Sequence, residues 1–190
     1  MLILASASPR RKMLLESAGL KPVIQIADID ESHAPHETPQ NYVMRMAQQK
    51  AAAIPVPHDD EPRYIIAADT IVVADNQILG KPSNATQAHA MLSNLSGRSH
   101  SVITGVCIVA AHTHQIRHFV TETRVFFAHL SEKTIQRYIQ TGEPMDKAGA
   151  YGIQSGAAGF VERIEGSYTN VVGLPLCETL QALSELGFES

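Results

Sequence analysis

The chain has 190 residues, of which 44% are hydrophobic and 18% are charged, and its formal net charge is -4. This composition is typical of a folded globular protein and excludes an intrinsically disordered chain. A negative net charge argues against general binding to nucleic acid, which needs a basic face. No segment has the roughly 18 uninterrupted apolar residues of a membrane helix. We therefore expect neither a nucleic-acid partner nor a membrane.

Strand and helix signals alternate along the chain. Ser8-Pro9 and Thr38-Pro39 each join a capping residue to a proline, as is typical of a helix start. In the first half, we expect a strand over residues 2–5, a helix over 9–18, a strand over 23–27, a helix over 39–54, two strands within 64–82 that turn at Asp75-Asn76, and a helix over 84–95. In the second half, we expect a long hairpin of 101–111 with 116–130, a helix over 131–140, a glycine-rich loop over 141–159, a strand over 160–164, a loop over 165–173 and a helix over 175–186.

Hairpins within this alternation indicate strands of both directions. We expect an α/β fold with a mixed twisted sheet and flanking helices, in two lobes around a central cleft. No linker divides the chain, so a single domain over residues 1–190 is predicted. Cys107 and Cys177 lack the spacing of a metal site, which favours a reduced, cytoplasmic protein.

The stretch ASASPRR, residues 5–11, raises the question of an anion. It puts Arg10 and Arg11 in the first turn of the expected helix, where the helix dipole is positive. Cations there are disfavoured by roughly several tenths of a kcal/mol each. An anion that takes the free N–H groups and both guanidinium groups would explain this placement.

Asp69 and Lys50 stand out because each is a charge in an apolar pattern. Asp69 interrupts an apolar run. It is either a residue at a strand end or bulge that backbone amides satisfy, or a base or metal ligand on a rigid element. Lys50 lies on the apolar stripe of the helix over 39–54. Its ammonium group either reaches solvent along the edge of the stripe or meets a phosphate.

Other candidates are weaker when taken alone. Lys81, in ILGKP, has the features of a solvated loop lysine. Glu31 lies in an acidic cluster with Asp28 and Asp30, which is weak evidence for a hard cation. The chain has no HExxH, Walker A or GxGxxG motif. The usual ways of holding zinc or phosphate are therefore not used.

Four motifs in order along the chain resemble the Maf family, the septum-formation-associated nucleotide pyrophosphatases. They are ASASPRR, AADT with a downstream GKP, DKAGAYGIQ and GSYTNVVGLPL. The resemblance covers residues 2–186 and looks like the branch that acts on dTTP and UTP. It implies an inosine triphosphate pyrophosphatase-like fold and hydrolysis of a nucleoside triphosphate to the monophosphate and pyrophosphate. It also implies a divalent metal cation, Mg²⁺ or Mn²⁺.

By matching position, the resemblance implies a role for each candidate. Asp69 would be the general base and a metal ligand, and Glu31 would help with the metal or the water. The phosphate-binding residues would be Ser6, Arg11, Lys50 and Lys81. The residues that set base preference would be Arg10, Thr70 and Gln154. The sister branch that acts on 7-methyl-GTP has tryptophan, glutamine and glutamate at those last three positions.

Two alternatives stay open beside a dTTP/UTP pyrophosphatase. The first is a nucleotide-sensing regulator of cell division without essential catalysis. Asp69 argues against it, because a pure binder gains nothing from a carboxylate beside a triphosphate. The second is a 7-methyl-GTP-type pyrophosphatase, which the base-facing residues would decide. A homodimer is a further expectation.

Overall fold

The computed structural model describes residues 1–57 and 61–189. Its strands are β1 (Leu2–Leu4), β2 (Val23–Ile24), β3 (Tyr64–Ala74), β4 (Gln77–Leu79), β5 (Ser99–Ala110), β6 (Gln115–Phe127) and β7 (Val161–Glu165). Its α-helices are α1 (Pro9–Ser17), α2 (Pro39–Ala52), α3 (Ala85–Leu95), α4 (Glu132–Gln140), α5 (Tyr168–Val172) and α6 (Leu176–Glu185). Three short 3-10 helices are η1 (Glu143–Asp146), η2 (Ala148–Ala150) and η3 (Gly156–Phe160). None of the helices in this described part has the length and apolar character needed to cross a membrane.

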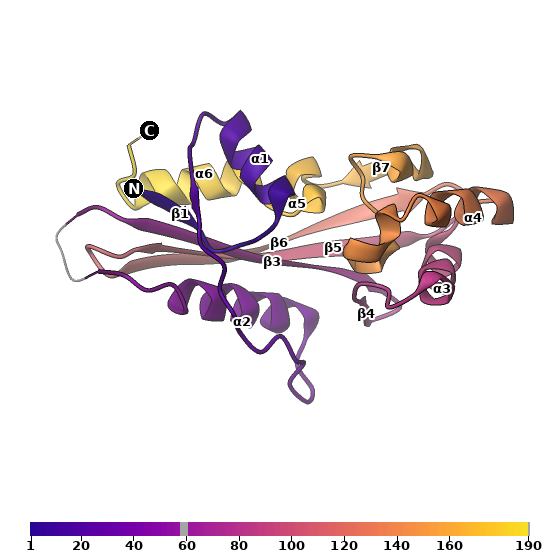
Figure 1. Cartoon of the computed structure of the whole chain (residues 1–190), viewed down its shortest axis with the longest axis horizontal. Coiled ribbons are helices and arrows are strands. Elements are labelled where there is room, and N and C mark those ends of the chain that lie inside the picture. Colours follow the sequence, from indigo (N-terminus) through magenta and orange to yellow (C-terminus); the bar gives the residue numbers. More distant parts are fainter. Residues whose placement is uncertain (58–60, 190) are drawn as a thin grey trace. The chain divides into compact units, whose positions relative to one another are not determined.

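The strands form a mixed sheet with the order β2-β1-β3-β5-β6-β7, and β4 pairs with β3. β1 pairs parallel with β2 and β3, whereas β4 and β7 pair antiparallel with β3 and β6. Helices flank the strands (Figure 1). The predicted α/β class with a mixed sheet is therefore confirmed.

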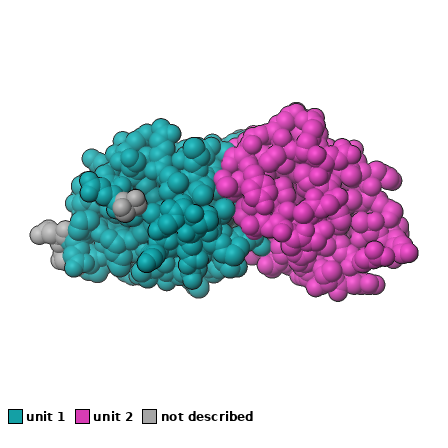
Figure 2. Space-filling view, turned by 90° about the horizontal axis from the view of Figure 1, so that it is seen from above, with its two compact units in different colours: residues 1–69, 104–121, 173–190 teal, residues 70–103, 122–172 magenta. Residues whose placement is uncertain are grey.

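The chain forms two compact units, which Figure 2 shows in different colours. Unit 1 consists of Met1–Asp69, Thr104–Thr121 and Gly173–Ser190, and unit 2 consists of Thr70–Ile103 and Glu122–Val172. Each unit has a hydrophobic core of its own. The single domain over residues 1–190 stays a prediction.

In unit 1, α2 covers one face of the strands, and α1 and α6 cover the other (Figure 1). Gly105 on β5 sets how closely α2 approaches the sheet. A Cβ atom at this position would lie 2.5 Å from the backbone carbon and oxygen of Val43 on α2. Because backbone atoms of a packed helix cannot give way cheaply, glycine permits this contact. The contact fixes the helix that carries Lys50 two turns further along.

Unit 2 has a core of aromatic rings. Phe127 on β6 lies edge-on to Tyr151, with ring centroids 4.8 Å apart, and to Phe160, at 6.1 Å. His100 on β5 is buried among them with 4% of its surface exposed. Its Nε2 lies 2.7 Å from the Tyr151 hydroxyl, whereas its Nδ1 has no hydrogen-bond partner among the described residues. Burial lowers the pKa of His100 to about 4.

This histidine predicts a loss of stability in acid. His100 has an ordinary pKa of 6.5 when the chain is unfolded, so below that pH the unfolded state binds the extra proton. The free energy of unfolding should therefore fall by about 3 kcal/mol between pH 7 and pH 4 from this group alone. Urea unfolding of the wild type and His100→Gln at both pH values measures the difference, with exposed His118→Gln as the control. An equal fall in the free energy of unfolding between pH 7 and pH 4 in all three proteins would contradict the prediction.

Several predicted boundaries differ from the structure; for example, the glycine-rich loop expected over 141–159 contains η1 and η2, and the hairpin strand expected over 116–130 ends at Phe127. The expected strand over 23–27 is only Val23–Ile24, because its partner β1 offers three residues and Leu4 pairs with Ile24. The expected loop over 165–173 contains α5. This helix forms because the Ser167 hydroxyl accepts a hydrogen bond from the Asn170 amide, a capping contact that the sequence prediction missed.

Candidate active site

The N-terminus of α1 holds a buried arginine in a fixed position. The Ser8 side chain caps the helix by accepting from the backbone amide of Arg11, and Pro9 takes the first position, as predicted. The Ser6 hydroxyl oxygen accepts from the Ser8 amide at 3.2 Å and from Arg11 Nη1 at 3.1 Å. Arg11 Nε donates to the carbonyl of Gly173 at 2.8 Å. Ser6 and Gly173, which lie far apart in the sequence of unit 1, thus both hold this guanidinium group.

The charge on Arg11 lies among other charges. Burial is the largest effect and lowers the pKa of its guanidinium group. The carboxylate of Asp69 raises this pKa, the charge of Arg10 lowers it, and the carboxylate of Glu31 raises it. Arginine nevertheless remains protonated at neutral pH. A cation buried at a helix N-terminus is unfavourable unless anionic groups face it. Asp69 and Glu31 supply such negative charge to Arg11, and a bound anion would add to it.

Lys50 lies between two carboxylates. Its Nζ is 2.7 Å from Asp69 Oδ1 and 2.7 Å from Glu31 Oε1. The side chains of Lys50 and Asp69 are 12% and 16% exposed, whereas that of Glu31 is 58% exposed. Asp69 lies inside β3 rather than at a strand end, and an ammonium group satisfies it. Lys50 therefore does not simply reach solvent from the edge of the apolar stripe.

Known proteins match this chain over almost its whole length. Residues 1–186 match the family model of Maf-like proteins. The chain belongs to the Maf family. The dTTP/UTP pyrophosphatase of Geobacillus sp. (strain WCH70) is 51% identical over 189 residues, which cover 98% of each chain. That of Geobacter sp. (strain M21) is 50% identical over 186 residues, which cover 98% of this chain and 95% of the relative. A HAM1 protein from Coxiella burnetii covers 97% of this chain, with 98% of its own chain matched, a TM-score of 0.47 and 15% identity.

In this Maf protein, the carboxylates of Asp69 and Glu31 fit the predicted divalent cation. Both contact one positively charged atom, Lys50 Nζ, so the two carboxylates lie close to each other, as two ligands of one cation must. Carboxylate oxygens are the ligands that Mg²⁺ prefers, and Mg²⁺ usually takes only one or two of them and completes its shell with phosphate oxygens and water. Among residues 1–57 and 61–189, no group of three or more His, Cys, Asp or Glu could hold a metal ion alone. The pair thus supplies two carboxylate ligands, and a divalent cation held there would need further ligands from outside the pair.

The predicted site residues divide between the units of the Maf fold. The members in unit 1 are Ser6, Arg10, Arg11, Glu31, Lys50 and Asp69. They are linked by the hydrogen bonds, ion pairs and charge effects described above. The members in unit 2 are Thr70, Lys81 and Gln154. The side chains of Lys81 and Gln154 are exposed, and the roles of these three residues stay predictions.

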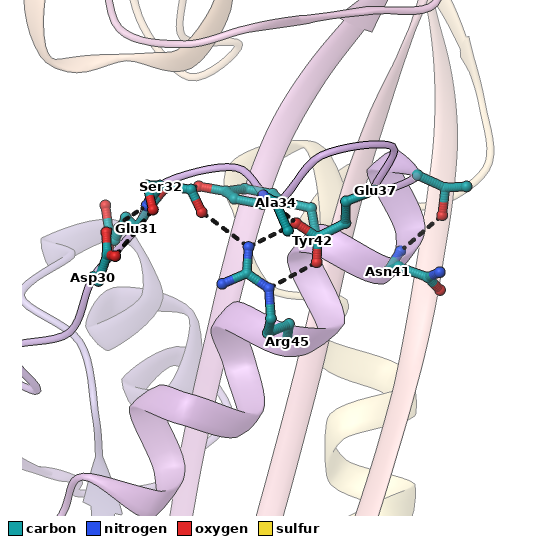
Figure 3. A network of polar contacts seen from close by, with 9 residues as sticks. Asp30, Glu31, Ser32, Ala34, Glu37, Asn41, Tyr42 and Arg45 are labelled. Atoms are coloured by element: carbon teal, nitrogen blue, oxygen red, sulfur yellow. Dashed lines mark hydrogen bonds and ion pairs between the residues drawn. The ribbon is translucent and has the colours of Figure 1, made fainter.

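Sequence reasoning missed the contacts around Glu31. Arg45 and Tyr42 on α2 bind the loop that carries it, and Glu37 on that loop pairs with Arg45 (Figure 3). One signal was available: Tyr42 and Arg45 lie three residues apart and share a helix face. Two polar residues on one face of a helix that follows an acidic loop indicate that the helix contacts the loop.

Proposed function

We propose that this Maf protein is a nucleoside triphosphate pyrophosphatase that hydrolyses dTTP and UTP to the nucleoside monophosphate and pyrophosphate. The observation that carries the proposal is Lys50 held at 2.7 Å from both Asp69 and Glu31, in the same unit as the buried Arg11. The dTTP/UTP pyrophosphatases that are about 50% identical to this chain support the substrate. The activity would clear these nucleotides from the nucleotide pool.

The charges of the site suit a triphosphate with a divalent cation. The cations are Arg10, Arg11 and Lys50, and the anions are Glu31 and Asp69. Within unit 1 these three positive and two negative charges leave one positive charge, and Lys81 of unit 2 would add one more. The sum is still too little for the several negative charges of a triphosphate. The proposed Mg²⁺ or Mn²⁺, bound by Asp69 and Glu31, would neutralise phosphate charge as phosphoanhydride hydrolysis requires.

The side chains of the site have distinct roles in the proposed reaction. Asp69 orients a water molecule in line with the phosphorus atom and accepts its proton, since a base that is held rigidly is most effective. The Lys50 ammonium holds one oxygen of this carboxylate in place. Arg11, fixed by Ser6 and Gly173, contacts the phosphate oxygens on which negative charge develops. Lys81 is assigned a phosphate contact and Arg10, Thr70 and Gln154 contacts with the base, from the family resemblance.

A nucleotide panel tests the proposed function. The wild type is incubated with dTTP, UTP, CTP, ATP, GTP and 7-methyl-GTP, with Mg²⁺, with Mn²⁺ and with a chelator, and the products are separated by ion-exchange chromatography. We expect monophosphate and pyrophosphate from dTTP and UTP, and none with the chelator. Release of diphosphate and phosphate, or tight nucleotide binding without turnover, would contradict the proposal. The second outcome would instead support a nucleotide-sensing regulator.

Lys50→Ala should lower kcat/KM for dTTP about a hundredfold, as the loss of one charged group at a reacting phosphate does. The temperature of unfolding should fall only modestly, because the substitution removes a partly buried cation and the 58% exposed Glu31 can turn to water, while Asp69, at 16% exposure, loses a partner. Steady-state kinetics and thermal unfolding measure the two effects. Lys133→Ala, an exposed lysine on α4, is the control. If Lys50→Ala has normal kinetics, Lys50 is only a structural ion-pair partner.

We further propose a cytoplasmic location, which the two free cysteines, Cys107 and Cys177, support. A homodimer and the absence of a nucleic-acid partner stay predictions. Analytical ultracentrifugation of the purified chain tests the dimer.

A further inference from the structure

The loop that carries Glu31 has no regular secondary structure. Residues 25–38, between β2 and α2, contain neither a strand nor a helix. The Glu31 side chain is more than half exposed, yet its carboxylate reaches Lys50. Since an exposed loop residue would otherwise sample many positions, other contacts must hold this segment in place.

Arg45 on α2 ties this loop to the helix. Its Nε donates to Glu37 Oε1 at 2.7 Å and its Nη2 donates to Glu37 Oε2 at 2.6 Å, a two-pronged ion pair. The same Nη2 donates to the carbonyl of Ser32 at 2.9 Å, one residue after Glu31. The Glu37 carboxylate also accepts from the Ala34 amide at 3.2 Å. Figure 3 shows that these contacts join both halves of the loop to one guanidinium group.

Tyr42 binds the same loop at Glu31 itself. Its hydroxyl donates to the Glu31 carbonyl at 2.9 Å, and its ring stacks on His33 with centroids 3.9 Å apart. The Arg45 guanidinium carbon lies 5.5 Å from the centre of the Tyr42 ring. The ring is 7% exposed, so α2 holds it firmly. The helix that carries Lys50 thus also fixes the backbone of the residue that pairs with Lys50.

We propose that Arg45, Glu37 and Tyr42 are positioning residues, which hold Glu31 against Lys50 and Asp69. The inference rests on the proposed function, in which Glu31 acts on the metal or the water. Groups that orient a ligand or a catalytic side chain commonly contribute tenfold to a hundredfold to activity or metal affinity, although they touch neither substrate nor metal.

The ion pair stays charged throughout the working range of an enzyme. The hydrogen bonds from Arg45 hold the pKa of Glu37 at about 2, and Glu37 raises the pKa of Arg45 in turn. The position of Glu31 is therefore set by geometry and not by the titration of this pair. The pair is partly buried, since the side chains of Arg45 and Glu37 are 29% and 9% exposed, so Arg45→Ala is expected to lower the temperature of unfolding as well as kcat. The kinetic comparison in two backgrounds separates the positioning effect from this loss of stability.

A double-mutant cycle tests the proposal. Arg45→Ala should lower kcat for dTTP about tenfold or more, but it should cause no further loss in a chain that already carries Glu31→Gln. The reason is that Arg45 acts through the Glu31 carboxylate. The proposal would be overturned if Arg45→Ala lowered kcat by the same factor in the Glu31→Gln chain as in the wild type. It would also be overturned if Arg45→Ala left kcat unchanged. Arg117→Ala, which breaks another Arg–Glu pair of unit 1 at Glu185, is the matched control and should have normal kcat.

Tyr42→Phe gives the same test with a smaller change. It removes the hydroxyl that donates to the Glu31 carbonyl and keeps the buried ring. Its kcat loss should also vanish in the Glu31→Gln background, and a loss of equal size in both backgrounds would contradict the proposal. This variant decides the question if Arg45→Ala does not fold. Arg45→Lys keeps the charge but not the two-pronged geometry, so it should recover only part of the lost kcat.

A readout that does not need activity separates this inference from the proposed function. The Ala34 amide should exchange hydrogen faster in Arg45→Ala than in the wild type or Arg117→Ala, because it loses an ordered acceptor. Unchanged exchange at Ala34 would overturn the positioning role. If the wild type hydrolyses no nucleotide, the proposed function fails, while the exchange measurement still decides whether Arg45 orders the loop.

Discussion

Asp69→Asn is expected to lower kcat for dTTP by about a hundredfold or more, the typical cost of losing a positioned base. The amide has nearly the same size as the carboxylate, and its oxygen can still accept a hydrogen bond from Lys50, so the fold should persist. It cannot take a proton from water, and it is a weaker metal ligand. Single-turnover kinetics with saturating Mg²⁺, together with nucleotide binding by calorimetry, separate lost chemistry from lost binding.

Asp75→Asn is the matched control for this substitution. Asp75 lies six residues further along the chain, in the turn between β3 and β4, with a φ of 50°. Asparagine adopts such a backbone conformation readily. Asp75 pairs with Arg98 at 2.5 Å, and both side chains are about half exposed, so normal turnover is expected. If Asp69→Asn turns over as fast as this control, Asp69 is not the base.

The wild type is expected to prefer dTTP and UTP to ATP, GTP and 7-methyl-GTP. A uracil or thymine ring offers two carbonyl acceptors and one N–H donor. These suit an arginine, a hydroxyl group and an amide that both donates and accepts, as Arg10, Thr70 and Gln154 provide. The cationic ring of a methylated guanine would instead favour an aromatic platform and a carboxylate.

Replacing those three residues should move the preference toward 7-methyl-GTP. The triple variant Arg10→Trp, Thr70→Gln, Gln154→Glu carries the residue types of the sister branch. The ratio of kcat/KM for 7-methyl-GTP to that for dTTP should rise by about tenfold or more, since each changed polar contact contributes about 1 kcal/mol. If the wild type prefers 7-methyl-GTP, or if the ratio is unchanged in the variant, these three residues do not set the base preference as proposed.

Helix starts and the short turn could be predicted because they depend on neighbours in the chain. The capping side chains of Ser8, Thr38, Asn84 and Ser131 each accept from an amide three residues later. The turn at Asp75 and Asn76 has positive φ at both residues, as expected for a two-residue hairpin. Both partners of such contacts lie within a few residues of each other, so the local sequence is enough to predict them.

The site was predictable as a set of residues but not as a set of contacts. Asp69 and Lys50 were recognisable as charges in apolar patterns, Arg11 as a cation at a helix start and Glu31 as part of an acidic cluster, and the family resemblance gave roles to these residues and to Ser6. Nothing in the pattern indicated that Lys50 pairs with both carboxylates. That contact depends on how closely α2 packs on β5 and on where an irregular loop places Glu31.

Local chemistry in the chain was therefore sufficient for most of the elements and for the fold class, and the family resemblance completed the set of candidate residues. Long-range packing set the rest, because its contacts join residues that no spacing rule relates. The carbonyl of Gly173 orients Arg11 from 162 residues away, and the missing side chain of Gly105 lets the backbone of α2 approach β5. Arg45 and Tyr42 hold the loop of Glu31 only because the folded chain returns it to the face of α2.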